Sequence, residues 1–225
     1  MCANIGSYSA ARRPSQVGTG AHLREHQRRF TAGAHIPYNP FMPIEDGTRA
    51  FVRLATLEDV PTLEKLIVAS VTHLQMDDYS ESQRQAALGL VFGIDSMLIN
   101  DGTYFVAVSE MQICACGGWS RRATPFGSDR SPVRDDTPLN PQRDAAKIRA
   151  LFVDPSCARR GFGTLILKAC EAAAKAAGFG TAELTATLTG AKLFRVHGFL
   201  PTEEIQIPLG NGESLRLIRM QKALK

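Results

Sequence analysis

Residues 151–164 read L-F-V-D-P-S-C-A-R-R-G-F-G-T and connect a short apolar run, residues 148–153, to a helical pattern over residues 163–177. The apolar run is typical of a buried strand, and the alanine-rich stretch has the periodicity of a helix. A strand that leads through a glycine-containing turn into a helix suits phosphate, because outward-pointing backbone N–H groups and the helix dipole both attract an anion. The segment therefore predicts a strand–turn–helix unit that holds a pyrophosphate-bearing cofactor.

Two glycines and two arginines give this turn its chemistry. Gly161 and Gly163 lack a Cβ atom where a ligand must approach the backbone closely. Arg159 and Arg160 add permanent charge and forked donors that suit phosphate oxygens. The turn is not a P-loop, since the chain has no Gly-Lys pair, and Ile166 stands where a dinucleotide fingerprint has its third glycine. A basic turn that only caps a helix is the alternative interpretation.

The order of strand, Asp-Pro, R-R-G-F-G-T and alanine-rich helix resembles the acetyl-CoA-binding segment of the GNAT superfamily of N-acetyltransferases. That family's Q/R-x-x-G-x-G/A loop falls on residues 158–163, where Ala158 departs from the pattern and both glycines match. Residues 191–199, A-K-L-F-R-V-H-G-F, resemble in shortened form the family's A-x-x-L-Y-x-x-x-G-F signature. The resemblance covers roughly residues 51–225, which is most of the chain.

The resemblance implies an acetyl-CoA-dependent N-acetyltransferase in which a primary amine, expected to belong to a small molecule, attacks the thioester directly in a ternary complex. The backbone of Leu151, Phe152 and Val153 would pair with the pantetheine arm like an added strand, and an N–H there could polarise the thioester oxygen. The pyrophosphate would be held by the turn and the first helical residues, namely Arg159, Arg160, Gly161, Phe162, Gly163 and Thr164. For Phe162 we expect contact through its N–H only, and packing on the core is the alternative.

The acid that protonates the leaving thiolate is where this chain departs from the family. The usual tyrosine, four residues before the glycine of the G-F ending, is Phe194 here, and phenylalanine cannot donate a proton. Tyr104 and His197 are the substitutes that the sequence offers, although His197 at a helix end is more commonly a surface residue. A thiolate that leaves without help is the remaining alternative.

Fewer sequence features indicate the catalytic base and the acceptor pocket. Glu183 lies early in the strand after the cofactor helix and could face the cleft as the base, although a solvated strand carboxylate is the commoner case. Trp119, Ser120 and Arg121 end the strand before a long loop and could wall the acceptor pocket. An ordinary half-buried core tryptophan is the alternative for Trp119.

The order of elements predicts a single mixed α/β domain over residues 47–225. Strands are expected at residues 51–54, 104–108, 113–119, 147–153, 182–187, 199–207 and 213–220. Helices interspersed among these strands would cover a central sheet. The GNAT resemblance implies that the sheet is mostly antiparallel and twisted, and that the strand before the phosphate turn splays from its neighbour to open a cofactor cleft. The loop at residues 125–142 is long for such a domain, so it is either functional or mobile.

The formal charge of +4 over 225 residues is unevenly placed. Residues 1–44 hold five arginines and one glutamate, so the remaining chain is neutral. A neutral body argues against nucleic acid as a partner, and no apolar run approaches the roughly 20 residues of a membrane span. Residues 1–46 are rich in Ser, Gly, Pro, Arg and His without periodicity, which predicts a flexible basic tail. A transit peptide is disfavoured because no amphipathic stripe is evident, and a physiological start at Met42 is another interpretation.

The five cysteines include no C-x-x-C pair, so neither a zinc site nor a redox motif is indicated, and no metal is expected. Reduced thiols in a cytoplasmic protein are the expectation. Cys114 and Cys116, two residues apart in a strand, are expected to face the same side of the sheet in the core. Cys157, beside the basic turn, is expected to be an inert loop cysteine.

Rival functions and the assembly stay open. Phe194 favours a non-catalytic acyl-CoA-binding sensor as the alternative function, because the usual acid is absent. Acetylation of a peptide N-terminus or a lysine is a third hypothesis, since the long loop would either admit or exclude a peptide. Dimers are common in the resembled family, so a homodimer is one expected assembly.

Overall fold

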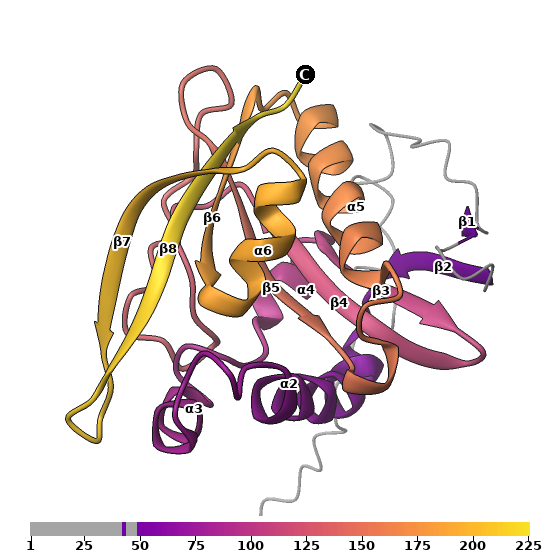
Figure 1. Ribbon diagram of the computed structural model, residues 1–225. Helices are drawn as coiled ribbons and strands as arrows, with labels where there is room; N and C mark the ends of the chain where they lie inside the picture. The colour runs from indigo at the N-terminus through magenta and orange to yellow at the C-terminus, as the bar shows by residue number, and fades with distance from the viewer. Residues whose placement is uncertain (1–41, 44–48) are drawn as a thin grey trace, which may run out of the picture. The chain divides into compact units, whose positions relative to one another are not determined.

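An open twisted sheet forms the centre of the computed structural model, which describes residues 42–43 and 49–225 (Figure 1). Its strands are β1 (Met42–Pro43), β2 (Arg49–Leu54), β3 (Tyr104–Ser109), β4 (Gln112–Ser120), β5 (Ala146–Val153), β6 (Thr181–Thr187), β7 (Leu200–Pro208) and β8 (Ser214–Ala223). Their order across the sheet is β1-β2-β3-β4-β5-β6-β8-β7. All described neighbours are antiparallel except β5 and β6, which are parallel. The predicted mixed α/β domain with a mostly antiparallel sheet is confirmed.

Helices cover both faces of this sheet. They are α2 (Val60–Leu74), α3 (Glu81–Ala87), α4 (Ser96–Asn100), α5 (Phe162–Ala176) and α6 (Leu188–Val196), with 3-10 turns η1 (Leu57–Asp59) and η2 (Pro155–Cys157). One buried cluster joins α5 and α6 to the sheet through residues such as Leu165, Ile166 and Phe194. A second cluster joins α2 to the other face through Leu63 and Ile67. The sheet is therefore buried on both sides, as its apolar strands require.

The splay between β5 and β6 is visible in their register. The two strands pair only over Ala146–Ile148 and Ala182–Leu184. Beyond that point β5 continues against β4, and β6 continues against β8. The expected opening therefore lies next to the segment that leads into the glycine turn.

Residues 1–41 and 44–48, which hold most of the predicted basic tail, lie outside the described residues. Met42 and Pro43, which fall inside the predicted tail, form β1 and pair with β2. None of the helices in the described part of the chain is both long and apolar enough to cross a bilayer.

Cys114 and Cys116 are both buried, but the prediction that they face the same side is wrong. Ala115 pairs with Ala107 and Ile113 pairs with Val108, so Cys114 is an extra residue in a β-bulge. A bulge interrupts the two-residue alternation of a strand. Cys114 accordingly packs in the cluster under α5, and Cys116 packs in the cluster over α2.

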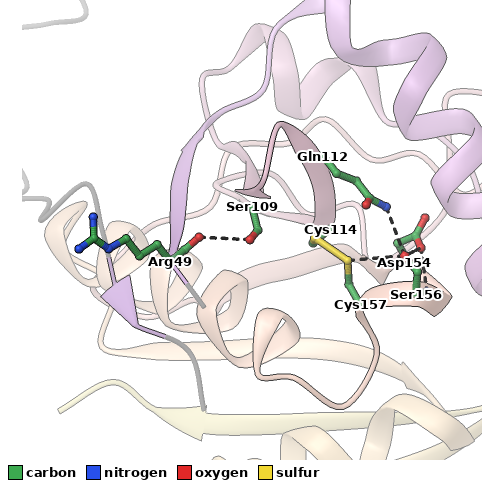
Figure 2. The surroundings of a disulfide bond; sticks show 7 residues. All are labelled: Arg49, Ser109, Gln112, Cys114, Asp154, Ser156 and Cys157. Atoms are coloured by element: carbon green, nitrogen blue, oxygen red, sulfur yellow. Dashed lines mark hydrogen bonds between the residues drawn. A yellow bond between two sulfur atoms is a disulfide. The ribbon is translucent and has the colours of Figure 1, made fainter. Parts of the chain in front are cut away.

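The expectation of unpaired thiols is wrong for Cys114 and Cys157, which form a disulfide (Figure 2). Both residues are buried, so the bond lies under the surface and joins β4 to η2, just before the glycine turn. Gln112 reinforces the same connection, because its Nε2 donates to Ser156 Oγ at 3.2 Å. Cys116 is free, and burial raises the pKa of its thiol to about 12.

We predict that the Cys114→Ala/Cys157→Ala variant is less stable than the wild type. The bond closes a sequence separation of 43 residues, and the loss of such a crosslink costs about 2–4 kcal/mol of unfolding free energy. Urea denaturation with and without a reductant measures this cost. The reductant should shift the midpoint of the wild type and of a Cys170→Ala control but leave the double variant unchanged. A wild type that is insensitive to a reductant under denaturing conditions would contradict the bond.

Candidate functional site

A cavity of about 200 Å³ lies where β5 leaves β6. Its central wall is β5 from Ile148 to Val153, and β6 with the start of α6 forms a second wall. On the other face of the sheet it is closed by the end of α2 and by residues 91–93 and 125–127. The cavity is therefore bounded by residues from both faces of the sheet at the point where the strands part.

A second bulge shapes the β5 wall. Cys116 pairs with Phe152 and Gly118 pairs with Arg149, so two β5 residues, Ala150 and Leu151, lie opposite one β4 residue. Ala150 has a φ of 52°, which side chains other than glycine rarely adopt. The buried Tyr104 holds the bulge, because its hydroxyl donates to the Ala150 carbonyl at 3.1 Å. A bulge leaves backbone groups out of the ladder, and here it does so beside the cavity.

The basic turn is built as a helix N-terminus. Gly161 is the N-cap of α5 with a φ of 93°, a conformation that favours glycine. At Gly163 an added Cβ would lie 3.2 Å from Leu193 and 3.4 Å from Val153, so this glycine also permits close packing of α5 on α6 and β5. Phe162 is 1% exposed and packs in the core, which leaves only its backbone for a ligand. Arg159 is exposed beside the turn.

Thr164 and His197 form a contact that the sequence did not indicate. Thr164 Oγ1 lies 3.0 Å from His197 Nε2, which joins the first turn of α5 to the end of α6. The pKa of His197 is lowered, chiefly by burial and further by Lys168 and Lys222. His197 does not line the cavity, so the structure places this candidate acid at the turn rather than at the cavity.

The structure brings no alternative acid to the cavity within the described residues. Phe194 lines it and packs edge-on against Phe199, with 5.9 Å between the ring centroids. The Tyr104 hydroxyl is engaged with the β5 bulge, and burial raises the pKa of this tyrosine. Tyr79 is likewise engaged, since it donates to the Arg216 carbonyl at 2.6 Å and accepts from Leu188 N at 2.9 Å.

Glu183 and the expected acceptor wall lie elsewhere. Glu183 Oε1 accepts from Lys147 Nζ at 2.7 Å in the paired part of β5 and β6, outside the cavity lining. Trp119 is 4% exposed, lies in the core under α5, and its ring contacts that of Phe179. Ser120 is buried, and Arg121 lies over the Trp119 ring at 5.8 Å. None of these residues lines the cavity.

The long loop after β4 supplies a cavity wall instead. A buried ion pair between Asp95 and Arg149 holds it, and Arg134 Nη1 lies 3.4 Å from Asp95 Oδ1. Arg149 also donates to the carbonyl groups of Thr124 at 3.3 Å and Gly127 at 3.4 Å. Burial lowers the pKa of the Arg149 guanidinium to about 10. These bonds attach the loop to β5, and residues 125–127 of the loop line the cavity.

Two backbone segments make the wall that sequence reasoning missed. Ser128 Oγ donates to the Gly89 carbonyl at 2.7 Å, and Ser128 N donates to the Leu90 carbonyl at 3.1 Å. These bonds join residues 88–95 to residues 124–131 and place Phe92 and Phe126 in the cavity lining. The apolar Pro125–Phe126 pair inside a polar loop is the one local signal that could have indicated this.

We predict that Asp95→Asn strongly destabilises the protein. The substitution leaves Arg149 as an uncompensated buried cation, and breaking a buried pair in this way costs about 3–5 kcal/mol. Thermal or urea denaturation measures the loss. The matched control is Asp101→Asn, which breaks the more exposed Arg122–Asp101 pair and should cost no more than about 1 kcal/mol. Equal losses at the two positions would contradict the role given to Asp95.

Comparison with known proteins places most of the cavity lining in one family model. The model of the acetyltransferase (GNAT) family matches residues 68–199, which is more than half of the chain and includes β5, the turn and α5. A search of curated proteins finds no match.

Solved structures with this fold include several N-acetyltransferases. A GCN5-related N-acetyltransferase, described as an aminotransferase of class II, from Rhodopseudomonas palustris is 24% identical with a TM-score of 0.57, over 77% of this chain and 94% of that one. PaiA N-acetyltransferase from Thermoplasma acidophilum, in complex with coenzyme A, is 14% identical with a TM-score of 0.53, over 77% and 98%. A ribosomal-protein-alanine N-acetyltransferase from Brucella melitensis is 18% identical with a TM-score of 0.53, over 77% and 99%. At these identities the likeness concerns the fold.

Proposed function

The chain belongs to the acetyltransferase (GNAT) family, and from that premise we propose that it transfers the acetyl group of acetyl-CoA to the primary amine of a small molecule. The observation that carries the proposal is the cavity, which extends from α6 and the end of β5 to the end of α2 and the long loop. An acyl donor that enters on one side and an amine that enters on the other can then meet at the β5 bulge. Holding the two reactants together in this way supplies much of the rate acceleration.

The residues at the turn fit the pyrophosphate of the acyl donor. Gly161 caps α5 in a left-handed conformation, and the first turn of α5 has no acidic residue. The exposed Arg159 adds positive charge there. We propose that residues 159–164 hold the pyrophosphate and that the β5 backbone over residues 151–153 pairs with the pantetheine arm. Bound acetyl-CoA supplies the thioester, whose carbon–sulfur bond breaks as the amine nitrogen forms its bond to the acetyl carbon.

The protons are moved with little help from side chains at the cavity. Arg149 is the only ionisable residue in the described cavity lining, and it is ion-paired. The amine must lose one proton as it is acylated, and the sulfur must leave as a thiolate or take up a proton. We propose that solvent protonates the leaving sulfur and that Glu183 accepts the amine proton through water.

The wall that the loop after β4 forms on the acceptor side favours a small-molecule acceptor over a peptide. The loop after β4 is joined to residues 88–95 and fixed to Arg149, and this narrows the space on the acceptor side. A peptide acceptor is the competing hypothesis, and one structural neighbour is described as a ribosomal-protein-alanine N-acetyltransferase. Phe194 at the cavity keeps the non-catalytic sensor as a second candidate. Tight acetyl-CoA binding without coenzyme A release from any amine or peptide would favour the sensor.

Calorimetric titration with acetyl-CoA tests the cofactor assignment. We expect binding in the micromolar range, about −8 kcal/mol. Gly161→Asp should weaken it at least tenfold relative to Gly161→Asn, since both side chains tolerate a left-handed backbone but only aspartate repels phosphate. The asparagine variant is thus the matched control for backbone strain. Equal affinities of the two variants would show that the pyrophosphate does not bind at this turn.

Glu183→Gln tests the proposed base. If Glu183 accepts the amine proton, kcat should fall by roughly 10²-fold or more, while the affinity for acetyl-CoA is unchanged. Lys147→Met is the control, because it breaks the same ion pair and keeps the carboxylate. A normal kcat in Glu183→Gln would mean that water alone takes the proton.

A further inference from the structure

The acceptor side of the cavity contains no counter-charge for an ammonium ion. Among the described lining residues there is no carboxylate, and the one cation, Arg149, is compensated by the buried Asp95. A second ammonium or a carboxylate on the acceptor would lose its hydration there without gaining a partner of opposite charge. The cavity therefore favours an acceptor that has no charged group other than the reacting amine. The amine itself must be neutral when it enters the cavity or lose its proton there.

The walls on this side are apolar. Leu74 comes from the end of α2, Val91 and Phe92 come from the segment after α3, and Phe126 comes from the long loop. Phe92 is further fixed by an edge-on contact with Phe152 on β5, with 6.2 Å between the ring centroids. Burial of a hydrocarbon part of the acceptor against these side chains would make binding more favourable.

Gln75 places in this region a buried acceptor atom without a hydrogen-bond partner in the described part of the chain. Gln75 is 5% exposed and lines the cavity, and its Oε1 has no hydrogen-bond donor among the described residues. Its backbone is fixed at the end of α2, because its carbonyl accepts from Asp78 N at 3.2 Å and Tyr79 N at 3.1 Å. A buried acceptor without a donor costs free energy. This oxygen is itself enclosed, so a rotation of the Gln75 side chain toward the cavity would let an amine N–H of the acceptor remove that cost.

We infer, on the basis of the acetyl transfer proposed above, that the acceptor is a primary amine with a compact apolar body and no second charge, and that Gln75 Oε1 accepts a hydrogen bond from its nitrogen. Gln75 is then a specificity-determining residue, since it distinguishes an amine from an apolar group of the same size. The amide supplies no negative charge, so it does not compensate a cation as a carboxylate would.

Three amines of similar size test the inference by coenzyme A release at saturating acetyl-CoA. These are 3-methylbutylamine, leucine, which is the same molecule with a carboxylate added, and 1,4-diaminobutane, which has a second ammonium group. We expect kcat/KM for 3-methylbutylamine to exceed the other two at least tenfold. The carboxylate also makes the leucine amine less basic, which by itself favours leucine, so selection against leucine reports on the cavity. Equal or better use of leucine or the diamine would overturn the inference.

Two variants test Gln75 itself. Gln75→Leu has nearly the same size but no acceptor atom, so it should raise KM for 3-methylbutylamine roughly fivefold and leave KM for acetyl-CoA unchanged. Gln221→Leu, at an exposed position of β8, is the control and should change neither. Gln75→Glu adds a carboxylate at the same place and should shift selection toward 1,4-diaminobutane. If the glutamate variant does not fold, the leucine variant decides, and an unchanged amine KM there would overturn the role of Gln75.

Failure of the inference and failure of the proposed function give different results. No binding of acetyl-CoA by calorimetry would mean that the proposed function has failed. Binding of acetyl-CoA with preferred acetylation of a charged amine or a peptide would overturn the inference alone. If acetyl-CoA binds and no amine is acetylated, 3-methylbutylamine should still bind the protein saturated with coenzyme A, and its failure to bind would overturn the inference as well.

Discussion

The site depends on one backbone constraint, which is that β5 and β6 stay paired only up to Ile148 and Leu184. Beyond this point the N–H and C=O groups on the facing edges of β5 and β6 no longer bond to one another. A buried backbone group without a hydrogen-bond partner costs free energy. The cavity lies at this place, between the diverging strands. The bulge at Ala150, held by Tyr104, shifts the register of the same strand against β4 on its other edge. The cavity is therefore a consequence of the interrupted pairing between β5 and β6.

A buried ion pair, Asp95–Arg149, fixes the long loop beside the cavity. Asp95 and Arg149 are both buried, and a buried pair contributes little net stability compared with an apolar pair of the same shape. What the pair provides is position, because Arg149 Nη1 and Nη2 also donate to the carbonyl groups of Thr124 and Gly127. The long loop is thus attached to β5, the strand that forms the central wall of the cavity. Movement of this loop would require breaking charge-assisted bonds in a region with little water, which explains why a polar loop can form a stable wall.

The sequence was sufficient for features that depend on neighbours in the chain. The turn around Gly161 and Gly163, the helix after it and the succession of strands along the chain follow from local glycine, charge and periodicity patterns. The splay of the strand pair followed from the family resemblance. Features that depend on distant partners were missed. Cys114 faces away from Cys116 because of a register shift against β3, and the disulfide follows from that shift. Gln75, Phe92 and Phe126 line one cavity only because separate loops bond to each other, and no periodic pattern predicts such bonds.

The loss of the tyrosine hydroxyl at Phe194 and the neutrality of the cavity are physically connected. A hydroxyl at this position would need a hydrogen-bond partner whenever the leaving sulfur is absent, whereas a phenyl ring needs none. The Phe194 ring packs against Phe199 and has no polar atom that needs a hydrogen-bond partner. A coenzyme A thiol is acidic enough to leave as a thiolate, so the proposed reaction does not require a hydroxyl at this position. In the proposed reaction, orientation of the amine and the thioester at the β5 bulge therefore supplies much of the rate acceleration.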